Sequence, residues 1–511
     1  ALRNLHGYDL RKKIALIASI ALRHGIERNW STCAFWTIPR LKRSHQLPEE
    51  QMADYLVRYY VLCASVGSFE RIFWGPLVSY REGLLDDGTG DRSSSDHRDV
   101  VAFYASYPGE PSQWRRRPAF HALQSLVRHL AGFRYHAARV AGQGLEIHEF
   151  RNDAQVCIVA WTKNGALARV ADCFDTESLA TLSASYSLDG VELEECPDFI
   201  TESPTYFTWS AAQAPQVLDS ACRVPQLVAA RAPAGERYYD YRTANWQGIL
   251  LARSRDEATR MIEAIGPEAI GSRAEAASLR KSRNAIWTVV DPRSPERMLV
   301  VKKPRNIVWH KRLLDRRKPS KALRSWNGTS ELMRRGIETP AVVAYFESTD
   351  PGALYDNWFF CEHVSGGSSV RAQFTRYAQG HDAVEGFSFE QFSQQLIRFV
   401  LQMHNRGIYF RDLAGGNVLL WSDSSGQLVF SLIDTARIRC LPGGLQLRHR
   451  LDDLKRLTNK LNLGQQADFM DRYLAHLNRR FVWRQRLSFK LYTRKVRLKR
   501  RKRRFMKRFI L

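Results

Sequence analysis

Hydrophobic residues change their spacing several times along the chain, and each change predicts a different kind of region. In residues 1–138, stretches with helical spacing at 52–65 and 119–130 alternate with an apolar run at 70–74 that predicts a buried strand. In residues 139–209, short runs with strand-like alternation lie between Gly, Asn and Asp turns, at 146–151, 154–162, 168–172 and 205–209. The first region therefore predicts alternating helices and strands, and the second predicts a small β-sandwich.

The second half of the chain begins with a weak pattern and then becomes strongly periodic. Residues 210–265 are rich in Ala, Pro and Arg and show little periodicity, so we expect a linker there. Residues 266–475 start with strand-like runs and continue with helical stretches, at 285–290, 297–302, 389–405 and 451–463. Together these patterns predict a multidomain chain of the α/β and α+β classes.

The composition narrows the class of protein. A chain of 511 residues is long enough for two to four domains, and 44% hydrophobic with 25% charged residues is typical of folded globular domains. The eight cysteines are scattered without a CxxC pair, which argues against a disulfide framework or a zinc site and indicates a reducing cytoplasm. The longest early apolar run, at 14–22, is too short to cross a bilayer and lacks a signal-peptide cleavage site.

The positive charge is concentrated at the end of the sequence. The formal net charge is +25, and residues 479–511 contain 16 Lys or Arg and no Asp or Glu, interleaved with aromatic and aliphatic residues. Each cation near an anionic membrane surface contributes about 1 kcal/mol, and the apolar residues can enter the interface. We therefore expect residues 476–511 to be a basic amphipathic tail that binds an anionic membrane surface. The alternatives are a solvated disordered tail and nucleic-acid binding, although no nucleic-acid recognition module accompanies the charge.

One loop and one strand end carry the most specific chemistry in the sequence. Arg411 and Asp412 precede Asn417, five positions after the aspartate, and a later apolar run ends in Asp434, seventeen positions further on. This spacing is typical of kinases that transfer a phosphoryl group from ATP. We expect Asp412 to be the catalytic base, and Asn417 and Asp434 to bind Mg²⁺.

An upstream strand supplies a candidate for phosphate binding. The run at 297–302 is followed by a second lysine, so Lys302 and Lys303 stand side by side at its end. Alternation along a strand places the two side chains on opposite faces, so only one of them can reach the α- and β-phosphates of ATP. We favour Lys302, and the alternative is that both lysines are solvated.

These residues resemble the lipopolysaccharide kinase family, whose members phosphorylate Kdo or heptose in the inner core. The resemblance covers about 279–465 and rests on residues 281–283, 300–302, 335–340, 412–417 and 432–439. It implies a two-lobed protein-kinase-like domain at 266–475, with ATP and Mg²⁺ as cofactors. It also implies that the acceptor is a sugar hydroxyl on a lipid-linked glycan, and that the bacterial protein binds peripherally to the cytoplasmic face of the inner membrane.

The sequence departs from the kinase pattern at three places. Phe410 stands where a His is usual before Arg-Asp, and no GxGxxG loop is present, so residues 282–284 would have to form the turn over the phosphates. Glu331 is the nearest candidate to pair with Lys302, but its register relative to Gly336 matches poorly. These departures leave open a second hypothesis, a non-catalytic kinase-like scaffold that binds glycan or partner proteins at the membrane.

The first region resembles the end of a retaining (β/α)8 glycoside hydrolase. Glu27 would match the nucleophile, and Trp74 the aromatic residue under the sugar, within the patterns at 25–30, 70–74, 83–87 and 117–123. Residues 139–209 resemble the accessory sandwich that follows such barrels. Retaining hydrolysis needs a second carboxyl about 5–5.5 Å away, from a strand that this sequence lacks, so we expect a truncated and hydrolytically inactive module. Alternatively Glu27 is a surface residue, and a third hypothesis makes the intact protein a glycoside hydrolase with a regulatory kinase domain.

Overall fold

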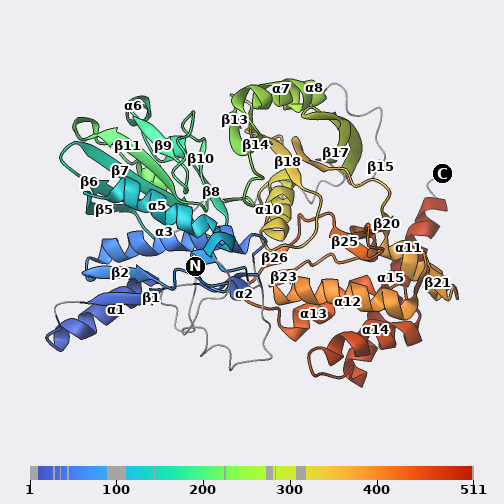
Figure 1. Cartoon of the computed structure of the whole chain (residues 1–511). Coiled ribbons are helices and arrows are strands. Elements are labelled where there is room, and N and C mark those ends of the chain that lie inside the picture. Colours follow the sequence, from blue (N-terminus) through green and yellow to red (C-terminus); the bar gives the residue numbers. More distant parts are fainter. Residues whose placement is uncertain are drawn as a thin grey trace. The chain divides into compact units, whose positions relative to one another are not determined.

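Figure 1 shows the computed structural model of the chain. It describes residues 10–26, 29–34, 36–42, 45–88, 111–142, 144–223, 226–271, 280–281, 284–305 and 318–508. Two compact units divide the chain: unit 1 comprises Ala1–Asp240 and Ala252–Arg255, and unit 2 comprises Tyr241–Leu251 and Asp256–Leu511. No helix in the described ranges is long and apolar enough to span a bilayer.

Unit 1 begins with a strand, a helix and a second strand parallel to the first. β1 (Trp30–Ala34) and β2 (Arg71–Trp74) pair in parallel, and α3 (Pro48–Val66) connects them along the chain. α3 starts with Pro48 in its first turn and ends at Gly67 with φ +67°, as expected for these residues at helix ends. The predicted alternation of helices and strands is confirmed, but the strand predicted to be buried is not, because Trp74 is the one buried residue of β2. A barrel end stays a prediction. The other elements before the large sheet are α1 (Leu10–Arg23), α2 (Ile38–Leu41), β3 (Leu85–Asp86), β4 (Arg115–Arg116) and α5 (Pro118–Leu130).

A five-stranded antiparallel sheet of order β5-β6-β7-β11-β9 follows α5. Along β7, Cys157 and Trp161 pack with residues of α3 and α5, whereas Val156 and Ile158 pack in a second core with Ala168 and Ile200. The strands predicted at 146–151, 154–162 and 205–209 are thus present, whereas the strand predicted at 168–172 ends at Arg169 and gives way to a 3-10 helix. The sheet also shares a core with the preceding helices. The bounds are β5 (Arg134–Val140), β6 (Leu145–Arg151), β7 (Gln155–Thr162), β9 (Ala184–Tyr186) and β11 (Thr205–Ser210), with α6 (Thr176–Ala180) and a small sheet of β8 (Ala166–Arg169), β10 (Phe199–Ile200) and β12 (Leu227–Val228).

The prediction of a linker at 210–265 is wrong, because this stretch contains three strands and a helix. β13 (Arg237–Arg242) and β14 (Trp246–Ala252) join the main sheet of unit 2, and β14 pairs with β18 (Val342–Ser348). α7 (Arg255–Ile265) and α8 (Pro267–Gly271) follow. The Ala- and Pro-rich residues around 229–235 obscured the strands on either side of them. β12 pairs with β8 and β14 pairs with β18, and both partners are far away in the sequence.

The first lobe of unit 2 is a seven-stranded sheet that carries one long helix. Its order is β13-β14-β18-β19-β17-β16-β15, with antiparallel pairing from β14 onward. α10 (Lys321–Arg334) packs against β18 (Figure 1). The ring of Trp326 on this helix lies 5.5 Å from that of Tyr345 between centroids. The remaining strands are β15 (Arg280–Lys281), β16 (Asn284–Asp291), β17 (Ser294–Pro304) and β19 (Asn357–Glu362).

The second lobe of unit 2 is mostly helical and holds the loop that contains Asp412. The helix predicted at 389–405 is confirmed as α12 (Phe389–Asn405), whose capping box joins Ser388 and Gln391. The stretch predicted as one helix at 451–463 instead divides into α13 (Leu447–Leu457) and α14 (Leu463–Ala475), because Asn462 caps the second helix. The other elements are β20 (Ser368–Ser369), α11 (Val370–Ala378), β21 (Ala383–Val384), β22 (Phe387–Ser388), β23 (Ile408–Tyr409), β24 (Val418–Ser422), β25 (Leu428–Leu432), β26 (Arg439–Cys440) and α15 (Trp483–Arg508).

Candidate active site

The loop between β23 and β24 brings three of the predicted site residues together. The Asn417 Nδ2 donates to the main-chain carbonyl of Asp412 at 2.9 Å, and the Asn417 carbonyl accepts from the Ile433 N–H at 3.0 Å. Asp434 follows Ile433 directly. Hydrogen bonds therefore join the backbone around Asp412 and Asn417 to the backbone just before Asp434, although 22 positions separate Asp412 from Asp434.

A turn far upstream fixes the strand that leads to Asp434. The main-chain carbonyl of Glu338 accepts from Leu432 N at 3.0 Å, and the Thr339 hydroxyl donates to the Leu432 carbonyl at 2.8 Å. The Gly-Ile-Glu-Thr-Pro turn thus hydrogen-bonds the last residue of β25 on both its N–H and its carbonyl. These bonds fix the end of the strand, two residues before Asp434.

Two residues of the site have a backbone conformation that is costly for residues other than glycine. Arg411 and Asp434 both have φ +64°. A left-handed non-glycine residue costs about 1–3 kcal/mol and persists only where the surrounding structure enforces it. Such residues concentrate at functional sites. Here Arg411 directly precedes the predicted base Asp412, and Asp434 is itself a predicted metal ligand.

Asp453 on α13 enforces the conformation of the loop, and the sequence analysis missed it. Its side chain is fully buried and accepts from the main-chain N–H groups of Phe410 and Arg411, both at 2.8 Å. His404 lies beside it, with Nε2 3.7 Å from an Asp453 oxygen, and its Nδ1 hydrogen-bonds the Tyr473 hydroxyl at 2.7 Å. Burial lowers the pKa of His404, although the nearby Asp453 opposes this shift.

Phe410 occupies the position before Arg-Asp as a core residue. Its side chain is fully buried in the hydrophobic core of the helical lobe. Because Asp453 holds the backbone of Phe410 and Arg411, the loop is anchored without any polar side chain at position 410.

Asp412 forms an ion pair at the edge of the loop. An Asp412 carboxylate oxygen lies 3.2 Å from Arg437 Nη1, and the two side chains are 37% and 55% exposed. Ion pairs at such exposure contribute about 0–1 kcal/mol, so a substrate hydroxyl can displace this contact at small cost.

The sheet separates the two lysines as predicted. Lys303 Nζ lies 3.4 Å from Asp356 and 4.9 Å from the Trp358 ring centroid, on one face. Lys302 is in register with Phe359, which is in register with Tyr345, so these three side chains share the other face. Since Trp326 of α10 contacts Tyr345, Lys302 lies on the face that α10 covers.

α10 also packs against the segment that contains Asp434. The Thr329 and Thr435 hydroxyls are 2.8 Å apart, and Thr435 donates to the Ser325 carbonyl at 3.0 Å. The approach requires Gly328, where a Cβ would lie 2.4 Å from the Thr435 carbonyl oxygen. One helix therefore connects the sheet face of Lys302 with the residue after Asp434.

The predicted pairing of Glu331 with Lys302 is wrong. Glu331 lies at the end of α10 and pairs with Arg334 and Arg335, at 3.2 and 3.1 Å. α10 contains no other acidic residue, and Lys302 has no ion pair within the described ranges. Glu331 lies in the last turn of α10, five residues before Gly336, and its carboxylate binds the arginines there instead of the lysine.

The oxygen atoms at this site suit a hard divalent cation. Because Asn417 Nδ2 is bound to the Asp412 carbonyl, its Oδ1 is left for a ligand, and Asp434 contributes carboxylate oxygens. Mg²⁺ prefers oxygen ligands and is usually held by one or two protein groups together with substrate phosphates. No group of three or more His, Cys, Asp or Glu side chains arranged for a metal occurs in the described part of the chain.

Of the two residues predicted for a glycosidase site, Glu27 and Trp74, the structure describes only Trp74. Glu27 lies outside the described residues, as do Ser282 and Arg283 of the proposed phosphate turn. Trp74 is only 8% exposed and stacks on Trp36 at 5.6 Å in the core of unit 1. Trp36 and Tyr59 cover its ring, which corrects the expectation of a sugar-stacking surface.

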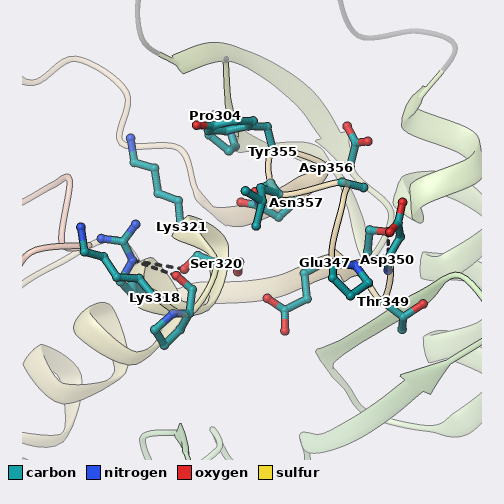
Figure 2. Close-up of a pocket in the computed structure, with 16 residues that line it drawn as sticks. Pro304, Lys318, Ser320, Lys321, Glu347, Thr349, Asp350, Tyr355, Asp356 and Asn357 are labelled. Carbon is teal, nitrogen blue, oxygen red and sulfur yellow. Dashed lines mark hydrogen bonds between the residues drawn. The ribbon is translucent and has the colours of Figure 1, made fainter. Parts of the chain in front are cut away.

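Two hollows in unit 2 lie outside the predicted catalytic residues. Figure 2 shows the first, of about 240 Å³, where Ser320, Glu347 and Asn357 converge at the start of α10. The second, of about 630 Å³, is open and lies between residues 363–366, which follow β19, and residues 420–422 of β24. The second hollow is thus bordered by the strand that begins directly after Asn417.

One family model matches the C-terminal region of the chain. Residues 271–501 match the model of the lipopolysaccharide kinase (Kdo/WaaP) family, and no curated protein matches the chain. This match confirms the resemblance seen in the sequence and extends it from about 465 to 501.

Similar solved structures include two kinases and a glycoside hydrolase. WaaP in complex with acyl carrier protein is 18% identical at TM-score 0.34, and covers 46% of this chain and 92% of that one. A glucosamine kinase is 14% identical at TM-score 0.25, over 52% and 84% of the two chains. A family 39 glycoside hydrolase from Bacteroides cellulosilyticus is 17% identical at TM-score 0.27, over 38% and 37%. All three TM-scores lie below 0.5, so neither a domain assignment nor an activity follows from these likenesses.

Proposed function

We propose that the lipopolysaccharide kinase family region of this chain transfers the γ-phosphoryl group of ATP to a sugar hydroxyl. The observation that carries this proposal is the backbone connection of Asp412, Asn417 and Asp434, anchored by Asp453 within the region of the family match. In the transfer, the bond between the γ-phosphorus and the β,γ-bridging oxygen breaks, and a bond from the sugar oxygen to phosphorus forms. ADP leaves, and Asp412 takes the hydroxyl proton.

The remaining residues have separate roles in this proposal. Asn417 Oδ1 and the Asp434 carboxylate would hold Mg²⁺, which when bound neutralises charge on the phosphates. Lys302 would bind the α- and β-phosphates from the α10 face of the sheet. Without an acidic partner on α10, Lys302 would rely on the phosphates themselves for its counter-charge.

We propose a lipid-linked glycan of the lipopolysaccharide-core type as the acceptor. The family match supports this acceptor class. The C-terminal helix α15 supports a membrane location, because its first turns pack on the helical lobe of unit 2 and its outer face is apolar and basic. Phe481 and Phe489 are buried in the core of the helical lobe and contact each other at 5.1 Å.

The outer face of α15 fits an anionic lipid surface. Trp483, Leu487, Leu491 and Leu498 are 67%, 48%, 54% and 65% exposed, and at 100° per residue they fall within an arc of about 80°. The exposed basic residues Arg484, Lys490 and Lys495 flank this stripe, and the exposed Arg494 falls within it. An apolar stripe bordered by cations is typical of helices that lie in the plane of a membrane interface. We place the protein on the cytoplasmic face of the inner membrane.

Labelled ATP and vesicles test both parts of the proposal. The protein should transfer labelled phosphate to lipid A that carries Kdo only when Mg²⁺ is present, and absence of transfer would refute the kinase. It should also sediment with vesicles that contain phosphatidylglycerol, and less so in high salt. Leu487→Ser should weaken this sedimentation, whereas Leu463→Ser, a similarly exposed leucine on α14, should not. Equal effects of the two substitutions would remove α15 as the membrane contact.

One observation favours a second candidate function, a non-catalytic scaffold. In protein kinases the strand lysine is held by a helix glutamate, and α10 offers Lys302 none. Calorimetry with Mg²⁺ and ATP separates the two functions, since a scaffold would bind no nucleotide.

A further inference from the structure

Two adjacent glycines in the catalytic loop are required by space and not by backbone conformation. Neither Gly415 nor Gly416 has a positive φ, so alanine fits the backbone at both positions. A Cβ at Gly416 would lie 2.4 Å from Nη2 and 2.5 Å from Cζ of Arg371. A Cβ at Gly415 would lie 2.9 Å from the main-chain nitrogen of the same residue. Both glycines therefore make room for Arg371.

The backbone around Arg371 is fixed by strand pairing, a helix cap and a buried neighbour, whereas its side chain is exposed. The preceding strand β20 pairs with β24, where Ser369 is opposite Leu419, two residues after Asn417. Val370 is fully buried in the core, and Ser369 caps α11 by accepting from Ala372 N–H. The Arg371 side chain is exposed, and within the described ranges its guanidinium has no hydrogen bond or ion pair.

We infer that Arg371 binds an anionic group of a substrate across the catalytic loop, an inference that rests on the proposed function. The loop itself has no cation between Asp412 and Asn417, and the glycines place a guanidinium against it from α11. A planar guanidinium binds carboxylate or phosphate oxygens with two parallel hydrogen bonds. Arg437 contacts Asp412, so two arginines flank the loop.

The anionic oxygens can come from the transferred phosphoryl group or from an acidic group on the acceptor. The acceptor is favoured, because Lys302 and Mg²⁺ already serve the triphosphate, whereas Asp412, which takes the acceptor proton, lies four residues before Gly416. The acceptor would then carry a carboxylate or phosphate close to the hydroxyl that reacts.

Kinetics of the full-length protein separate these sources. With Mg·ATP and Kdo-bearing lipid A, Arg371→Ala should lower kcat/KM for transfer about 10- to 100-fold, as expected for a lost charge-assisted hydrogen bond. If the acceptor supplies the anion, its KM rises and slow hydrolysis of ATP by water is unchanged. If the phosphoryl group supplies it, hydrolysis falls in parallel. Arg376→Ala, on the same helix and paired with Glu385, is the control and should leave both rates unchanged.

Gly416→Ala provides an independent arm, because it should displace only the flexible end of Arg371. Its loss of transfer should approach that of Arg371→Ala, and the double variant should lose no more than Arg371→Ala alone. Gly464→Ala, where a Cβ meets ordinary van der Waals contact, controls for the change of residue type. Changes below twofold in both Arg371→Ala rates would overturn the inference, whereas absence of transfer by the wild type would refute the proposed function itself.

Discussion

Asp453 offers the sharpest test of how the loop is built, because one buried carboxylate holds two consecutive main-chain N–H groups. Asp453→Asn keeps one acceptor oxygen and turns an amide donor toward the other N–H. A hydrogen bond to a charged group contributes about 1.5–3 kcal/mol, so the free energy of unfolding of unit 2 should fall by roughly 2–3 kcal/mol. Asp453→Ala, which loses both acceptors, should cost about 3–5 kcal/mol.

The effect on activity should exceed the effect on nucleotide binding. Arg411 has φ +64° and holds this conformation against strain through the Asp453 contact, so Asp412 should shift when the contact is lost. A displacement of about 1 Å can cost 10²-fold in rate, whereas Lys302 and Asp434, the proposed ligands of Mg·ATP, should stay in place. The assays are urea unfolding, steady-state transfer to Kdo-bearing lipid A, and calorimetry with Mg·ATP.

Asp452→Asn is the matched control for this change. Asp452 is the neighbouring residue on α13 and binds the Tyr409 hydroxyl and Arg456, and its side chain is 36% exposed. Among the described residues it makes no hydrogen bond to the backbone of the loop. We expect it to cost less than about 1 kcal/mol and to leave kcat within about twofold. If Asp453→Asn and Asp452→Asn behave alike, the loop is not anchored as described.

Three further predictions concern residues around the site. Lys302→Ala should weaken Mg·ATP binding about tenfold or more, whereas Lys303→Ala, whose ammonium pairs with Asp356 on the other face, should not; equal calorimetric constants for the two would contradict the assignment of faces. Glu331→Gln should leave Mg·ATP affinity within about twofold, because Glu331 pairs with Arg334 and Arg335, and a loss as large as that of Lys302→Ala would restore the pairing rejected above. Burial lowers the pKa of His404. Below about pH 6.5 the imidazole is therefore protonated in the unfolded chain but stays neutral in the folded chain. The free energy of unfolding should consequently decrease as the pH is lowered. The urea midpoint should therefore drop between pH 7 and 5, and His404→Gln should make this drop smaller; an unchanged drop would contradict it.

Local spacing was enough to locate most of the candidate site. The positions of Asp412, Asn417 and Asp434 in one loop and one strand end were readable, since the distances between them along the chain are short. The opposite faces of Lys302 and Lys303 followed from strand alternation and are confirmed by the register. The helix at Phe389–Asn405 followed from its capping signal and apolar stripe.

Most of the features that the sequence did not predict share a physical cause, because the residues involved have partners far away in the sequence. β14 looked like part of a linker since its partner β18 lies about one hundred residues later. Asp453 carried one readable sign, a charged residue among the apolar positions Leu454 and Leu457 of the α13 stripe, but the N–H groups that it binds are more than forty residues away. Glu331 was the nearest acid by sequence, and helix geometry turned it toward Arg335. The two glycines of the loop gave no sign of Arg371, which only the fold brings against them.

We propose that Asp412 takes the acceptor proton during phosphoryl transfer, and replacing this residue tests that role. Transfer from γ-labelled ATP to Kdo-bearing lipid A should fall about 10²- to 10⁴-fold in Asp412→Ala, as is usual for loss of a general base. Calorimetry on the same preparation should show Mg·ATP affinity within about threefold of the wild type, because Lys302, Asn417 and Asp434 remain. Undiminished transfer by Asp412→Ala would contradict the account.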